Sequence, residues 1–111
     1  MRAVSYVLPL LLLIPACATI EVGQDFDLAA FEAKARQGVT TQVEVRAWLG
    51  APPGVGQSVE STGERYEQWT YYHGKGRLSG MADARVQILQ IKFDPRGVLR
   101  AYNWSGEARQ P

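Results

Sequence analysis

Residues 86–104 read VQILQIKFDPRGVLRAYNW, and the fold expected for the chain follows from this segment. Leu89, Ile91 and Phe93 alternate with polar residues, which is the pattern of a strand with one buried face. The tetrapeptide at 94–97, Asp-Pro-Arg-Gly, fits a tight turn, because proline presets φ and glycine tolerates a positive φ. The stretch therefore predicts a β-hairpin with strands at 86–93 and 98–104.

A glycine bulge in this turn would decide which side chains share a face. It predicts Phe93 opposite Leu99 and Ile91 opposite Ala101, with all four facing a core. The other face would then carry the side chains of Ile88, Gln90, Lys92, Arg100, Tyr102 and Trp104. A register slip of one residue would exchange the two sets.

Part of that outer face has the composition of a protein interface. Aromatic and arginine side chains are enriched at the energetic centres of interfaces. We therefore expect a partner-binding surface formed by Ile88, Lys92, Arg100, Tyr102 and Trp104. The alternative is that the two rings only cover the sheet or pack on the C-terminal tail.

The residues before the hairpin predict two helices and one more strand. Asp27 is a suitable N-cap for a helix that ends near Gly38, and Thr41 with Glu44 fits a capping box for a second helix that ends at Gly50. Residues 65–72 are rich in aromatic residues and predict a strand, whereas 52–63 and 73–84 have the composition of loops. The order predicts an α+β domain, with two N-terminal helices packed on one face of a three-stranded antiparallel sheet (α-α-β-β-β).

The N-terminus has the features of an export signal. Arg2 precedes an apolar run from Ala3 to Ile14, which is shorter than the ~20 apolar residues of a membrane span. The tetrad Ile14-Pro15-Ala16-Cys17 resembles a bacterial lipobox, which implies cleavage before Cys17 and acylation of that residue. Ala16-Cys17-Ala18 also fits an ordinary cleavage site with release after Ala18, and this alternative stays open.

The lipobox interpretation divides the chain into four parts. Residues 1–16 would be a lipoprotein signal peptide, 17–26 a lipidated tether, 27–106 the folded domain and 107–111 a tail. Since Ala18 follows the cysteine in place of an aspartate, the resemblance implies the periplasmic face of the outer membrane.

The composition argues against several classes of function. The formal net charge is +1, and the chain lacks the dense basic cluster expected of a nucleic-acid-binding protein. There is one histidine, His73, in a predicted loop where we expect it to be exposed, so no histidine cluster can hold zinc. No catalytic group, cofactor, metal or small-molecule substrate is indicated, and we expect a protein that is not an enzyme.

Three groups of residues together resemble the SmpA/OmlA family of outer-membrane lipoproteins. They are Cys17 behind its lipobox; Gly38-Val39-Thr40-Thr41 leading to Leu49-Gly50-Ala51-Pro52; and Trp69-Thr70-Tyr71 followed by Leu89-Gln90-Ile91-Lys92-Phe93-Asp94 and Gly97-Val98-Leu99. The resemblance implies an accessory scaffold of the β-barrel assembly machinery, which supports outer-membrane protein assembly or envelope integrity. The predicted fold also resembles β-lactamase-inhibitory-type domains, so a periplasmic binding or inhibitor module is the alternative function.

Overall fold

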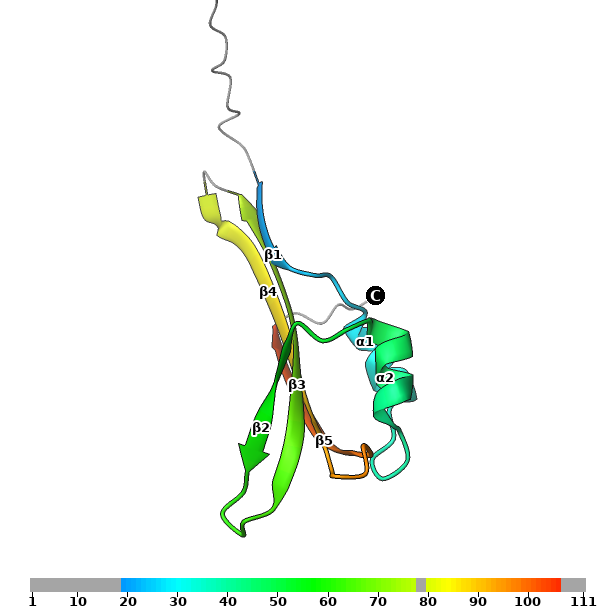
Figure 1. Ribbon diagram of the computed structural model, residues 1–111. Coiled ribbons are helices and arrows are strands. Elements are labelled where there is room, and N and C mark those ends of the chain that lie inside the picture. Colours follow the sequence, from blue (N-terminus) through cyan, green and yellow to red (C-terminus); the bar gives the residue numbers. More distant parts are fainter. Residues whose placement is uncertain (1–18, 78–79, 107–111) are drawn as a thin grey trace, which may run out of the picture.

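The computed structural model describes residues 19–77 and 80–106, which form two short helices and an antiparallel sheet (Figure 1). In chain order the elements are β1 (Thr19–Gly23), α1 (Leu28–Lys34), α2 (Gln42–Leu49), β2 (Gly54–Val59), β3 (Arg65–Arg77), β4 (Gly80–Phe93) and β5 (Leu99–Gly106). The expected signal peptide at 1–16, the acylated Cys17 and the tail at 107–111 lie outside the described residues.

The sheet has five strands, so the expected α+β fold with a three-stranded sheet is wrong. The segment expected to be a tether contains β1, and the loop expected at 52–63 contains β2. The loop expected at 73–84 is mostly strand, because β3 runs to Arg77 and β4 begins at Gly80. These segments form backbone ladders without a buried alternating side-chain pattern, and β1 is exposed along its whole length. Glycine at six of their positions (23, 54, 56, 74, 76 and 80) further weakened the strand signal.

Two short strands share one edge of β3. Here β1 pairs with residues 73–77 and β2 with residues 65–70, while β4 occupies the opposite edge. Tyr71 and Tyr72 therefore have no strand partner on the β1/β2 edge. The chain leaves β1 and enters β2 at this gap, which is where the helical segment joins the sheet (Figure 1).

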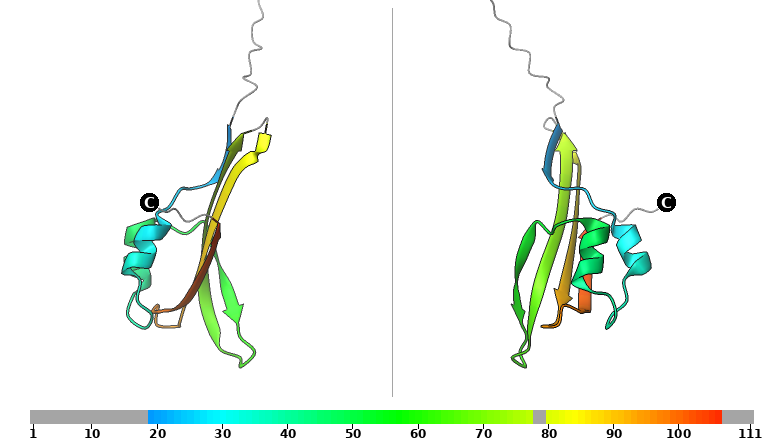
Figure 2. Two further views of the ribbon diagram at one scale, coloured as in Figure 1. Left: turned by 180° about the vertical axis from the view of Figure 1, so that it is seen from behind. Right: turned by 45° about the vertical axis from the view of Figure 1, so that its right-hand side comes forward.

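The upper end of the β3–β4 hairpin projects beyond the rest of the sheet. Strand β5 pairs only with residues 87–93 of β4, so the distal part has three strands, with β1 and β4 flanking β3. We call this part the distal blade and define it as β1, residues 73–77 of β3 and residues 80–86 of β4. Both views of Figure 2 show it extending away from the helices.

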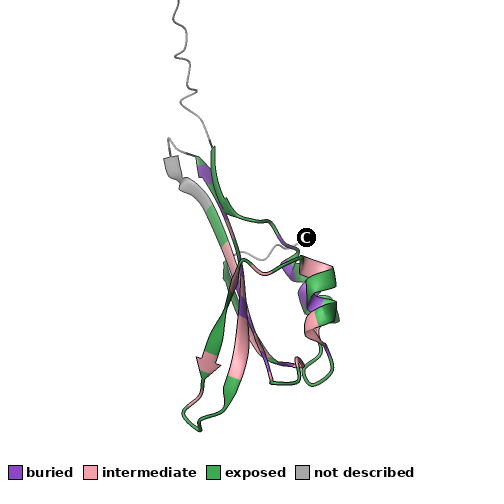
Figure 3. Ribbon diagram, in the orientation of Figure 1, coloured by how far each residue is buried: buried purple, intermediate pink, exposed green. Residues whose placement is uncertain are grey.

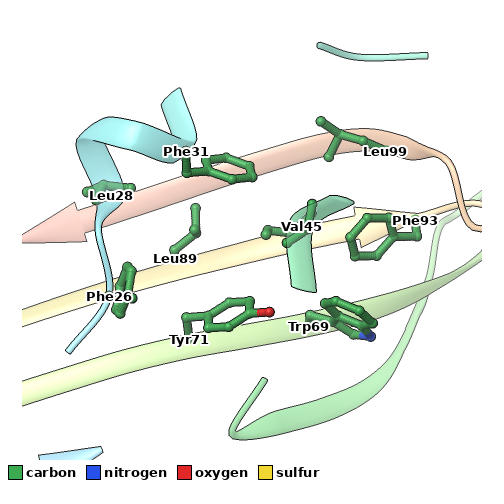
Figure 4. Packing of buried hydrophobic residues seen from close by; sticks show 10 residues of the cluster. Phe26, Leu28, Phe31, Val45, Trp69, Tyr71, Leu89, Phe93 and Leu99 are labelled. Atoms are coloured by element: carbon green, nitrogen blue, oxygen red, sulfur yellow. The ribbon is translucent and has the colours of Figure 1, made fainter. Parts of the chain in front are cut away.

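The helices begin at the caps that the sequence predicts. The Asp27 side chain accepts a hydrogen bond from the backbone N–H of Ala30, and Thr41 and Glu44 form a complete capping box. Both helices lie against one face of the sheet, and the close-up in Figure 4 shows their side chains meeting those of β3, β4 and β5. The buried core consists of Phe26, Leu28, Phe31, Val45, Trp69, Tyr71, Leu89, Ile91, Phe93 and Leu99.

The β4–β5 hairpin has the turn predicted from the sequence, but beyond the first pair its register differs from the predicted one. Gly97 has a φ of 81°, and Phe93 lies opposite Leu99, as predicted. The ladder then shifts by one residue between Lys92 and Phe93, because Arg100 is an additional residue on β5. Ile91 consequently lies opposite Tyr102, and the predicted pairing with Ala101 is wrong. The bulge therefore exchanges the faces of all residues of β5 beyond Arg100.

Candidate functional site

The face of the sheet away from the helices, which we call the open face, carries a polar hollow of about 570 Å³ at the end opposite the distal blade. Three groups of residues line it: the turn between β2 and β3, side chains from β3 to β5, and the connection between the helices. They are Gln37, Gly38, Glu60, Ser61, Thr62, Glu64, Tyr66, Lys92, Arg100 and Ala101.

Local hydrogen bonds fix both walls of this polar hollow. In the β2–β3 turn, the N–H of Gly63 donates to the carbonyl of Glu60, and the N–H of Glu60 donates to the carbonyl of Glu64, each at 2.8 Å. On the other side, the N–H of Gly38 donates to the carbonyl of Leu99 at 2.8 Å. The helix connection is thus held along the free edge of β5, and the sheet forms the floor between the two walls.

One cation of the polar hollow is already paired. Lys92 Nζ lies 2.8 Å from Glu60 Oε2, and the Ser58 hydroxyl donates to the same oxygen at 3.2 Å. The hydrogen bond from Lys92, with the charge of that ammonium, lowers the pKa of the Glu60 carboxyl below its ordinary value. The ion pair of Lys92 and Glu60 therefore links β4 to the β2–β3 turn.

The second cation has a different environment. Arg100 is exposed, and across residues 19–77 and 80–106 its guanidinium has no hydrogen-bond or ion-pair partner. Beside it, the Tyr66 hydroxyl donates to Glu64 Oε1 at 2.9 Å, and this hydrogen bond raises the pKa of the Tyr66 phenol. An arginine next to an aromatic ring can bind a carboxylate in bidentate geometry while the ring packs on apolar atoms.

The five residues predicted to bind a partner lie on two different faces of the sheet. Lys92 and Arg100 meet in the polar hollow, whereas Ile88 is on the same open face nearer the distal blade. Tyr102 and Trp104 lie on the helix side, which corrects the prediction that they face outward. Because of the β5 bulge, Tyr102 packs edge-to-face on Phe31 at 4.9 Å, and Trp104 donates to Glu32 at 2.7 Å.

Tyr66 and the turn at 60–64 were absent from the predicted site. Strand pairing places Tyr66 and Tyr72 on the side of β3 opposite Trp69. What the sequence did not indicate is that residues 54–59 form a strand, which brings Glu60 and Glu64 beside β4 and β5. The only signal was the Ser-Thr-Gly turn composition at 61–63.

His73 contacts side chains of the β1 segment and is not the exposed loop residue that we expected. It lies on β3, its side chain is 14% exposed, and its Nε2 is 2.5 Å from Glu21 Oε2 on β1. The hydrogen bond with His73 lowers the pKa of the Glu21 carboxyl. Asp25 Oδ1 lies 3.7 Å from Nδ1 of the same ring, so His73 connects the β1 segment to β3.

The side chains of the described residues include no group of three or more histidine, cysteine or carboxylate residues able to hold a metal. No helix within 19–77 and 80–106 has the length and hydropathy needed to cross a bilayer.

Comparison of the chain with protein-family models, with curated proteins and with solved structures found no match.

Proposed function

We propose that this protein is a non-enzymatic, lipid-anchored binding protein on the periplasmic face of the outer membrane. The apolar segment that ends in Ile14-Pro15-Ala16-Cys17 supports acylation of Cys17. Anchoring confines the domain to a surface, which raises its effective concentration near other membrane-bound proteins, so that weak contacts suffice.

The observation that carries the binding role is Arg100 beside Tyr66 in the polar hollow, with no partner for its guanidinium within 19–77 and 80–106. Glu60 is paired with Lys92 and Glu64 accepts a hydrogen bond from Tyr66, so Arg100 is the cation of the hollow that has no partner among the described residues. An acidic side chain or a C-terminal carboxylate of a protein partner fits this arrangement. By the resemblance to SmpA/OmlA lipoproteins, we propose that the partner is a component of the β-barrel assembly machinery.

Anchoring is tested by labelling cells with a fatty acid and separating the membranes. The mature protein should carry the label at Cys17 and sediment with the outer membrane, and Cys17→Ser should abolish the label. An unlabelled chain that starts at Thr19 would contradict the anchor and support cleavage after Ala18.

Binding is tested with a photo-reactive amino acid at Ser61, on the rim of the polar hollow, and at the exposed Val43 of α2 as a matched control. Crosslinks from position 61, and not from position 43, to a barrel-assembly component would support the proposal. Crosslinks to a soluble periplasmic enzyme would instead favour the inhibitor function. Equal crosslinking from both positions would contradict a binding role for the hollow.

A further inference from the structure

The distal blade has one face that is apolar and exposed. Ile20 is 45% exposed, Val22 and Val86 are each 55% exposed, and Tyr72 is 39% exposed. Strand pairing places these four side chains on the open face of the sheet, away from the helices. Figure 3 shows β1 coloured as exposed over its whole length.

Glycine makes this apolar face continuous. Val22 and Val86 both pair with Gly74, one from each neighbouring strand. A β-carbon added at Gly74 would lie 3.1 Å from Val22 Cγ2 and 3.6 Å from Val86 Cγ2, so the two valines lean over the glycine from both sides. Soluble monomers rarely leave such contiguous apolar surface exposed without a function.

The opposite face of the distal blade carries the basic side chains of Lys75, Arg77 and Arg85, which line an open hollow, together with the acid Glu21, which pairs with Lys75 across the strands. One face of the blade is thus apolar and the other is polar with an excess of basic groups, which is the distribution found in structures that lie in a membrane interface. Basic side chains at that depth are attracted to anionic headgroups.

The length of chain before β1 places this blade close to the proposed anchor. Thr19 pairs with Arg77 at the tip of the blade, and Cys17 is only two residues earlier. Two residues of extended chain span at most ~7 Å, so an acylated Cys17 would hold Thr19 within the headgroup region. Ile20 and Val22, on the same strand, then lie within about 17 Å of the anchor.

We infer that the distal blade lies in the lipid interface, with Ile20, Val22, Tyr72 and Val86 facing the acyl chains. This inference rests on the proposed acylation of Cys17. It also gives the domain an orientation. The open face would point toward the bilayer, and the polar hollow, with Tyr66 eight residues from Gly74 along β3, would lie roughly 26 Å from the lipid-facing side chains along the strand.

The test uses acylated full-length protein in vesicles of the zwitterionic and anionic lipids typical of a bacterial envelope. Because the only cysteine would be acylated, a cysteine introduced at Val86 gives a unique site for a nitroxide label. The matched controls carry the label at Val43 on α2, which is 78% exposed, and at Val59 on β2, which is 56% exposed. Accessibility of each label to oxygen and to a water-soluble nickel chelate then reports its depth.

We expect the label at position 86 to be accessible to oxygen and at least five-fold less accessible to the chelate than the labels at 43 and 59. Equal chelate accessibility at the three positions would overturn the inference. Protection from both reagents, with dipolar broadening between labels, would assign the face to a second copy of the chain and would also overturn it. Mass analysis before reconstitution separates these results from failure of the anchor, because an unacylated Cys17 contradicts the proposed function itself.

Discussion

The hydroxyl of Tyr71 donates a 2.8 Å hydrogen bond to the carbonyl oxygen of Gly50. Tyr71 lies at the gap between β1 and β2 on the edge of β3, and Gly50 ends α2 with a φ of 88°. The bond joins a buried strand residue to the end of a helix 21 positions away in sequence. It therefore fixes the place where the chain passes from the helices back into the sheet.

Tyr71→Phe should destabilise the fold by about 1 kcal/mol, because the Gly50 carbonyl loses its donor while the ring packing is kept. Urea unfolding followed by circular dichroism measures the change. Tyr66→Phe is the matched control, since its hydroxyl bonds an exposed carboxylate, and it should change stability by much less. Equal losses of unfolding free energy in the two variants would show that the Tyr71–Gly50 hydrogen bond contributes no more than the exposed Tyr66–Glu64 bond.

Alkaline pH should destabilise the protein through the same residue. Burial raises the pKa of Tyr71 from 10 to about 12. A group whose pKa is raised on folding stabilises the protein below its unfolded pKa, and that contribution is lost as pH rises through the folded value. Stability should therefore fall between about pH 10 and pH 12 more steeply in the wild type than in Tyr71→Phe. Parallel curves for the two proteins would contradict this assignment.

Tyr102→Ser should cost about 3 kcal/mol, because it removes the ring that packs edge-to-face on Phe31 under α1. Thermal unfolding measures the effect. Tyr72→Ser offers a comparison on the exposed face of β3, where little native packing is lost. A small effect at position 102 would indicate that β5 lacks the bulge at Arg100.

Gly23→Ala should detach β1 from the sheet without unfolding the core. Gly23 has a φ of 76°, and a β-carbon there would lie 2.2 Å from the backbone oxygen of Tyr72, which no side-chain adjustment can relieve. Hydrogen exchange should show loss of protection at residues 73–77 and little change in β5. Gly56→Ala is the control, because its added carbon meets nothing within 4 Å.

Arg100→Ala should weaken partner binding by roughly thirty-fold, the scale of an interface hot spot, while leaving stability nearly unchanged. The exposed Arg46 of α2 provides a control with the same charge change on the helix layer. The affinity of each variant for the crosslinked partner is measured and compared with that of the wild type. If Arg46→Ala weakened binding as much as Arg100→Ala, net charge and not the polar hollow would account for binding.

Local features of the fold were predictable from the sequence. The caps at Asp27 and Thr41 and the turn at Gly97 depend on residues three or four positions apart, and all three are present. The alternating run of Leu89, Ile91 and Phe93 likewise identified a buried strand face. The site was only partly predictable: Lys92 and Arg100 do meet, but their neighbours Glu60 and Glu64 come from a turn that the sequence did not connect to them.

Strands β1 and β2 and the bulge at Arg100 could not be found in the same way. Exposed, glycine-bearing strands bury few side chains, so their pairing depends on a backbone edge that another strand must first provide. A bulge depends on how two strands fit together, and its single extra residue reversed the faces of Tyr102 and Trp104. The caps, the turn and the buried face of β4 follow from the sequence alone, because each arises within a few residues. The number of strands, the register of β5 and the residues of the hollow follow from tertiary structure, because each requires segments distant in sequence to meet.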